Sequence, residues 1–85
     1  MGHYEFFLEY DGKKTNARAY DSPVDEVVAP TLQQAVEKFC KKHKLELSRM
    51  DSLEDGTYRV YLMKKSFLRG TTEFIYYIEP LPANN

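Results

Sequence analysis

A chain of 85 residues suits one compact domain (residues 1–85), and its twelve basic and thirteen acidic side chains leave a formal net charge of -1. This balance gives no global field that would draw the whole chain to nucleic acid or to an anionic membrane. One cysteine cannot form an internal disulfide, no apolar run approaches the ~20 residues of a membrane span, and residues 1–10 lack a signal-peptide pattern. We therefore expect a cytoplasmic protein with no membrane segment.

The first strand is predicted over residues 3–10. Apolar side chains alternate there with others that include two glutamates, which is typical of a strand with one face on a core. Phe7 lies between these glutamates and would face outward. The side chains expected to face inward are Tyr4, Phe6, Leu8 and Tyr10.

An Asp-Gly dipeptide follows the first strand and is a strong signal for a two-residue hairpin turn. With that turn, residues 14–20 would be the second strand, and Glu5 would lie opposite Arg18 in a pair of opposite charges. In the alternative interpretation, residues 24–29 are the true second strand and residues 11–23 are mostly loop.

Residues 31–43 have the pattern of the chain's one long helix. Thr31 can cap the N-terminus through its hydroxyl, and Gln34 completes a capping-box sequence. Lysines at the C-terminal end lie where the helix dipole favours cations. Apolar or small side chains recur at the spacing of one helix face and should pack on the core. They are Leu32, Ala35, Val36, Phe39 and Cys40.

Three further strands are predicted over residues 45–50, 57–64 and 71–79, and Pro80 is expected to end the last of them. Residues 80–85 would form a flexible tail. One helix beside antiparallel strands is typical of a two-layer α+β domain. We predict one α-helix packed on an antiparallel β-sheet of four to five strands, in the order β-β-α-β-β-β.

The sequence contains few signals of catalysis or of metal binding. Cys40 lies on the inward helix stripe without an adjacent base that would activate it. His3 and His43 are far apart in the chain, and no spacing assembles the ligands of a metal site. The acidic segment at residues 51–56 lacks oxygen ligands that an EF-hand calcium loop requires. We therefore predict no catalytic residue, no cofactor and no metal, and we expect that the chain is not an enzyme.

The sheet face away from the helix is the first candidate for a partner-binding surface. A solvated sheet face should carry polar side chains, but apolar and aromatic residues recur here, and such patches on small domains mark interfaces. In the alternative, some of these side chains pack on each other, under the tail or under residues 24–29. Tyr20 is expected on the same face. The residues expected to bind a partner are Phe7, Tyr61, Met63, Ile75 and Tyr77.

The loop predicted at residues 64–69 is the second candidate surface. Three cations there flank two large apolar side chains, an arrangement that suits a protruding anchor for a partner. In the alternative, the two apolar side chains fold back into the core. The loop residues expected to bind a partner are Lys64, Lys65, Phe67, Leu68 and Arg69.

These observations favour a non-catalytic protein-interaction module that binds a protein partner or a second copy of itself. The length and the element order resemble those of small phage inhibitor proteins, including some anti-CRISPR proteins, and the resemblance involves no sequence motif. It implies inhibition of a host or defence complex as one form of protein binding. In a further alternative, Phe7, Tyr61 and Tyr77 stack on the bases of a nucleic acid bound to the sheet.

Overall fold

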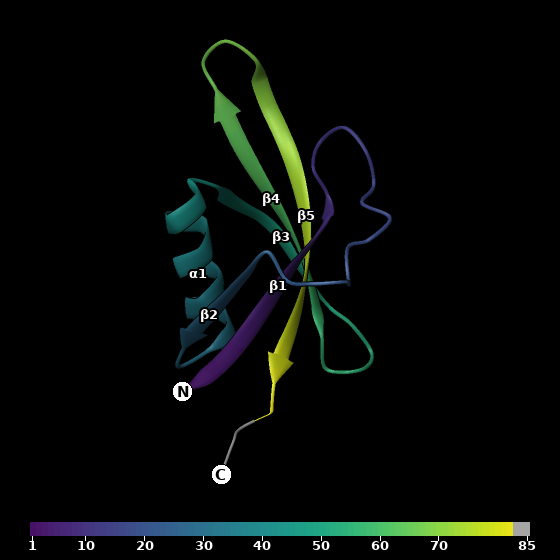
Figure 1. The fold of residues 1–85 in the computed structure, drawn as a ribbon. Helices are drawn as coiled ribbons and strands as arrows, with labels where there is room; N and C mark the ends of the chain where they lie inside the picture. Colours follow the sequence, from purple (N-terminus) through teal and green to yellow (C-terminus); the bar gives the residue numbers. More distant parts are fainter. Residues whose placement is uncertain (83–85) are drawn as a thin grey trace.

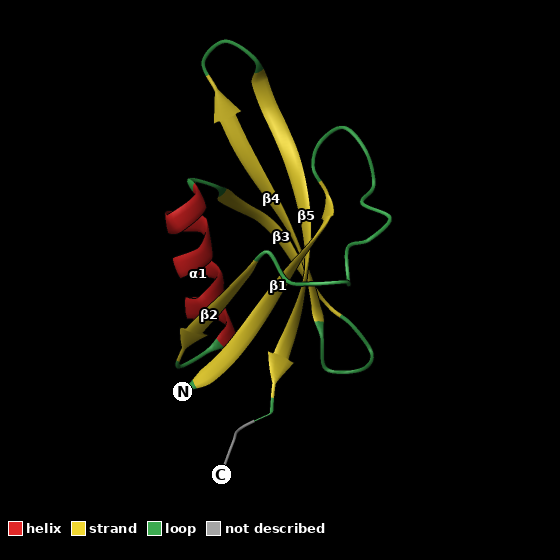
Figure 2. Ribbon diagram, in the orientation of Figure 1, coloured by secondary structure: helices red, strands yellow, loops and turns green. Residues whose placement is uncertain are grey.

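The computed structural model describes residues 1–82, in which five strands form one sheet and a single helix covers one of its faces (Figures 1 and 2). The strand order is β2-β1-β5-β4-β3, and all neighbours are antiparallel. The predicted α+β class, with one helix packed on an antiparallel sheet, is confirmed. The elements are β1 (Gly2–Tyr10), β2 (Asp25–Ala29), α1 (Leu32–His43), β3 (Glu46–Ser52), β4 (Tyr58–Ser66) and β5 (Gly70–Leu81).

Both ends of α1 follow from local side-chain chemistry. Thr31 precedes the helix in an extended conformation, and its hydroxyl oxygen accepts a hydrogen bond from the backbone N–H of Gln34 at 3.2 Å. At the other end, Lys44 adopts a left-handed conformation (φ 57°) and its N–H donates to the carbonyl of Cys40. The predicted helix and its N-terminal cap are therefore confirmed.

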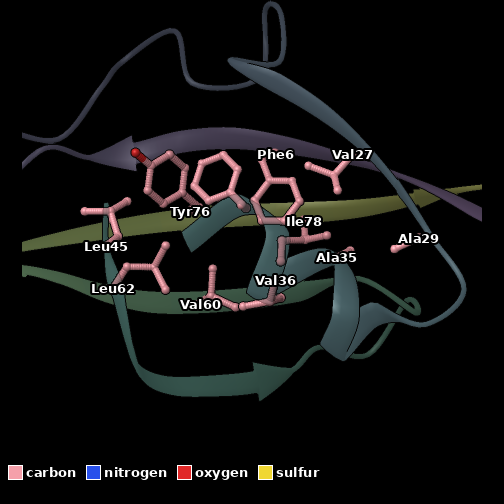
Figure 3. Close-up of a cluster of buried hydrophobic side chains, with 11 residues drawn as sticks. Phe6, Val27, Ala29, Ala35, Val36, Leu45, Val60, Leu62, Tyr76 and Ile78 are labelled. Atoms are coloured by element: carbon pink, nitrogen blue, oxygen red, sulfur yellow. The ribbon is translucent and has the colours of Figure 1, made fainter. Parts of the chain in front are cut away.

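The core lies between α1 and the inner face of the sheet (Figure 3). The rings of Phe6 and Phe39 stack with centroids 4.1 Å apart and planes 4° from parallel, and the ring of Tyr76 meets Phe39 edge-on at 4.8 Å. The expected packing of the helix stripe is confirmed at Val36 and Phe39, which are fully buried. Partly buried side chains around this core are Tyr4, Leu8, Leu32, Cys40, Met50, Tyr58 and Phe74.

The predicted pairing of residues 3–10 with residues 14–20 is wrong. β1 pairs with β2, and Glu5 lies opposite Glu26 rather than opposite Arg18. Residues 11–24 form a loop with one isolated bridge next to the turn. The alternative interpretation, in which the second strand lies within residues 24–29, matches β2.

Two physical effects explain why β2 takes the place of the predicted strand. Val27 and Ala29 of β2 bury their side chains in the core, whereas the predicted segment offers mostly small and polar side chains. In addition, the carboxylate of Asp11 accepts hydrogen bonds from the backbone N–H groups of Lys13 and Lys14, at 3.0 and 3.1 Å. Such local bonds compete with the ladder of a hairpin.

A bulge in β1 changes which face its last residue occupies. Leu8 lies opposite Tyr76 and Tyr10 lies opposite Ile75, so Glu9 is an extra residue relative to β5. Because a shift of one residue reverses the face of the side chains that follow, Tyr10 lies on the face away from α1. The prediction that Tyr10 faces the core is therefore wrong.

The last strand is longer than predicted. β5 continues past Pro80 to Leu81, with Pro80 opposite Tyr4, so the predicted strand end at Pro80 is wrong. β4 begins opposite Ile78, so the backbone at Pro80 has a neighbouring strand on one side only. A missing N–H is tolerated in such a position. Of the predicted tail, residues 83–85 lie outside the described residues.

Candidate binding surface

β4 and β5 extend beyond the rest of the sheet as a two-stranded ribbon (Figure 1). β3 stops pairing with β4 at Met63, and β1 stops pairing with β5 at Ile75. Within the described residues, the ribbon strands beyond these points pair only with each other. We use the term ribbon for residues 64–72. The tip is therefore the end of a single hairpin that projects beyond the rest of the sheet.

Two large apolar side chains stand at the tip of the ribbon. Phe67 and Leu68 have exposed fractions of 102% and 89%, so the alternative in which they fold back into the core is wrong. The turn is closed by a hydrogen bond from the Arg69 N–H to the hydroxyl oxygen of Ser66 (3.3 Å). Gly70 follows with φ 78°, in the region that favours glycine. The turn thus presents both side chains to solvent.

Cations flank this apolar tip on both strands. Lys65 Nζ lies 3.4 Å from the Glu46 carboxylate, but both side chains are mostly exposed, so the pair contributes little stability. Among residues 1–82, Lys64 and Arg69 form no ion pair. The five residues predicted in this loop are therefore brought together, with two cations free to meet a partner.

The turn after β1 packs against the base of the ribbon. Gly12 has φ 92°, and a Cβ at this position would overlap Cγ2 of Thr72, so only glycine fits. This close approach places the exposed Lys13 and Lys14 near the base of the ribbon. Hydrogen bonds from their backbone N–H groups lower the pKa of Asp11. The position of these two lysines near the base of the ribbon could not be predicted from the sequence.

On the outer sheet face, the loop between β1 and β2 covers part of the predicted binding surface. Tyr20 of this loop packs on Phe7 and Tyr77, with ring centroids 6.2 and 5.2 Å from its own. Phe7 is only 6% exposed as a result, so its ring is not available to a partner. This agrees with the alternative interpretation in which outward side chains pack on each other, but the covering segment is the loop and not the tail or residues 24–29.

A charged network holds this loop on the sheet. Arg59 of β4 donates to both carboxylate oxygens of Glu9, at 2.6 and 3.1 Å, and the Tyr20 hydroxyl donates to the same carboxylate. Burial of Glu9 opposes its ionisation, but the hydrogen bonds from Arg59 and Tyr20 outweigh this effect and lower the pKa of Glu9. Arg59 is thus neutralised within the chain. The network depends on the bulge at Glu9, which the sequence pattern did not reveal.

The remaining predicted residues of the outer face form a narrower strip near the ribbon. Tyr61 lies directly opposite Ile75, and Met63 follows two residues later on β4. All three side chains are half-buried, and the guanidinium of Arg49 lies 4.2 Å from the centre of the Tyr61 ring. The strip ends where the ribbon begins, so it adjoins the base of the ribbon. Tyr77 belongs instead to the cluster with Tyr20.

The side of the molecule that carries α1 has an ion-pair cluster centred on Asp25. The Asp25 carboxylate accepts hydrogen bonds from Lys42 Nζ and lies 3.0 Å from His43 Nε2. Burial of Asp25 opposes its ionisation, but these bonds outweigh it and lower the pKa of Asp25. Cys40 is close in the same helix, and burial raises the pKa of its thiol. A protonated thiol is a poor nucleophile. The ion pairs of Asp25 with Lys42 and His43 link α1 to β2.

Among residues 1–82, no group of three or more His, Cys, Asp or Glu side chains could hold a metal ion. No helix in the same part of the chain is long and apolar enough to cross a membrane.

Comparisons with protein-family models, with curated proteins and with solved structures give no match for this chain. Function must therefore be inferred from the surface of the molecule itself.

Proposed function

We propose that the chain is a non-catalytic, cytoplasmic protein-interaction module that binds a protein partner through the tip of its ribbon. The observation that carries this proposal is the full exposure of Phe67 and Leu68 at the end of the ribbon. Burial of such side chains is worth roughly 1.5–3 kcal/mol each. A pocket that takes both would gain roughly 3–6 kcal/mol before the cost of association.

The strip of Tyr61, Met63 and Ile75 gives this contact a second part. It adjoins the base of the ribbon on β4 and β5, so a partner that receives the tip can also rest on this strip. Tyrosine suits such a role, because it combines a large apolar ring with a polar hydroxyl. Phe7 is not part of this surface, since Tyr20 covers it.

A second copy of the chain is one candidate partner, and a host or defence complex is another. A projecting tip that fills a pocket on another protein also blocks that pocket, which is how a small binding module acts as an inhibitor. The resemblance of the length and element order to those of small phage inhibitor proteins is the basis of that form of the proposal.

Nucleic-acid binding is the second candidate function, favoured by the shape and charge of the ribbon. A two-stranded ribbon fits the major groove of DNA, which is about 12 Å wide. However, three ribbon cations can neutralise about three phosphates, so affinity would fall about 40-fold between 50 and 200 mM salt. Arg59 does not supply a further phosphate contact, because its guanidinium is already paired with the Glu9 carboxylate.

A comparison of two variants with acidic substitutions, one at the tip and one away from it, tests the proposed function. The tagged chain and its Phe67→Asp, Leu68→Asp variant are incubated with a lysate of the native host, and retained proteins are quantified by mass spectrometry. Val24→Asp is the matched control, because Val24 is another exposed apolar side chain, 52% exposed and far from the ribbon in sequence. We expect a partner to be retained by the parent and the control and lost by the tip variant.

Retention of the same proteins at the same level by all three chains would contradict the proposal. A sedimentation measurement on the purified chain identifies the case in which the partner is a second copy. A gel shift with duplex DNA and with single-stranded RNA tests the second candidate function, which requires binding that weakens steeply with salt.

A further inference from the structure

We infer that the pocket that receives the tip is apolar at its base and ringed by carboxylates, so that the partner presents an acidic protein surface. This inference rests on the proposed function, because it concerns the same tip. It adds the chemistry of the partner, which the exposure of Phe67 and Leu68 alone does not provide.

The first observation is the segregation of charge within the chain. The ribbon, residues 64–72, contains three basic side chains and no acidic one, which leaves nine basic against thirteen acidic side chains elsewhere. The nearly neutral total therefore combines a cationic projection with an anionic body. A partner that meets the ribbon encounters a charge opposite in sign to that of the rest of the molecule.

The second observation is the position of these charges in the fold. The turn between β3 and β4, residues 53–57, carries two acidic side chains, Glu54 and Asp55. Figure 1 shows this turn at the opposite end of β4 from the ribbon. An acidic partner is attracted to the ribbon end and repelled by the other end, so it is oriented before contact. Charges arranged in this way raise the association rate and the specificity of binding.

The third observation is that Lys65 is the one ribbon cation paired within the described residues, through its exposed contact with Glu46. Among the described residues, Lys64 and Arg69 form no ion pair, and neither do Lys13 and Lys14 near the base of the ribbon. Arg69 thus lies in the turn at the tip, and Lys64 lies at the base of the ribbon opposite Thr72, the residue that Gly12 approaches. Carboxylates around the mouth of a pocket would meet them while the apolar side chains enter the pocket.

The same observations favour an acidic protein over a nucleic acid. A duplex long enough to contact the tip would also face the anionic body of the chain, which would repel its phosphates. Leu68 has no aromatic face on which a base could stack. A protein pocket can instead meet the ribbon alone, and it can bury both Phe67 and Leu68.

The experiment captures the partner at the tip and then changes only the charge. Phe67 is replaced by the photoreactive residue p-benzoylphenylalanine, which keeps an aromatic side chain, and the chain is irradiated in a lysate of its native host. The same probe is placed in a Lys64→Glu, Arg69→Glu background. The control background is Arg18→Glu, Lys41→Glu, which changes the net charge by the same amount at exposed positions outside the ribbon.

We expect a cross-linked protein from the parent and the control backgrounds, and a yield about tenfold or more lower from the ribbon variant, because like charges would then meet. The yield from the parent should also fall as salt is raised. Acidic side chains should surround the cross-linked position on the captured protein. Equal yields from all three backgrounds would overturn the acidic pocket while leaving the proposed function intact.

The remaining outcomes are also decisive. A product that nuclease removes would identify a nucleic acid as the partner and overturn this inference. A product of twice the chain's mass from the purified chain would identify a second copy in place of a separate acidic protein. If no protein is captured at position 67 in any background, the proposed function fails, and this inference fails with it.

Discussion

Replacement of Phe39 by alanine tests whether the helix and the sheet form one core. Its ring is fully buried, stacks on Phe6 at 4.1 Å and meets Tyr76 at 4.8 Å. Loss of a buried aromatic ring combines a transfer term, a cavity and the lost ring contacts, so Phe39→Ala should cost about 3–5 kcal/mol. A domain of 85 residues has roughly 4–13 kcal/mol of stability, so the variant loses much of it.

The assay is unfolding by heat and by urea, followed by far-UV circular dichroism. For a domain of this size, each kcal/mol shifts Tm by about 4–8 °C, so a loss of 3 kcal/mol lowers Tm by at least about 12 °C. Phe67→Ala is the matched control, because it removes the same side chain from a position that is fully exposed. Its stability should stay within about 0.5 kcal/mol of the parent.

A Phe39→Ala variant that melts within a few degrees of the parent would refute this reasoning, since α1 would then not pack on Phe6. A control that loses as much stability as Phe39→Ala would also contradict it. In that case Phe67 would be packed in solution, and the exposed tip would not exist. The pair of variants therefore tests the core and the candidate surface together.

Three other predictions concern local features. The pKa values of Glu9 and Asp25 are lowered by folding, so their stabilising effect is present above the unfolded pKa of about 4 and is lost as pH falls through the folded pKa. Thermal unfolding should therefore show a fall in Tm as the pH is lowered, and Glu9→Gln should make that fall smaller. Gly12→Ala should cost more than about 1 kcal/mol and more than Gly56→Ala, because both have positive φ but only Gly12 is crowded. Thr31→Ala should cost about 1 kcal/mol in urea unfolding, since it removes the helix cap.

The features that sequence predicted well depend on short-range spacing. The helix required only a cap at Thr31 and apolar side chains at the spacing of one face, and both signals lie within the segment itself. The alternation in residues 57–64 and 71–79 likewise identified β4 and β5. The inner faces of these alternating segments and of residues 3–10 include Phe6, Val60, Leu62 and Ile78, which are all fully buried.

The first hairpin could not be predicted in the same way, because its outcome depends on a competition between distant segments. The turn signal at Gly12 is genuine, since the chain does turn there with positive φ. However, β2 offers Val27 and Ala29 to the core, and this burial outweighs the charge pairs of the predicted register. The bulge at Glu9 is also set by its partners Arg59 and Tyr20, which are remote in sequence.

The residues of the candidate surface could be predicted from the sequence, but the orientation of their side chains could not. A run of cations around Phe67 and Leu68 was visible in the sequence, yet two opposite orientations of these side chains were compatible with it. Pairing decided the orientation, because β4 and β5 continue past Met63 and Ile75 where their neighbours stop. The burial of Phe7 under Tyr20 could not be predicted either, because it depends on where the loop between β1 and β2 lies on the sheet.

The tip combines two properties that folding alone does not explain. Exposed apolar pairs at the end of a strand ribbon favour aggregation, and a monomeric domain gains nothing in stability from them. Adjacent cations oppose such aggregation, because two copies that meet tip to tip would bring like charges together. Lys64, Lys65 and Arg69 therefore keep Phe67 and Leu68 accessible while disfavouring contact between identical tips. The same charges do not oppose an acidic surface, so the features that protect the tip would also favour the acidic partner that we propose.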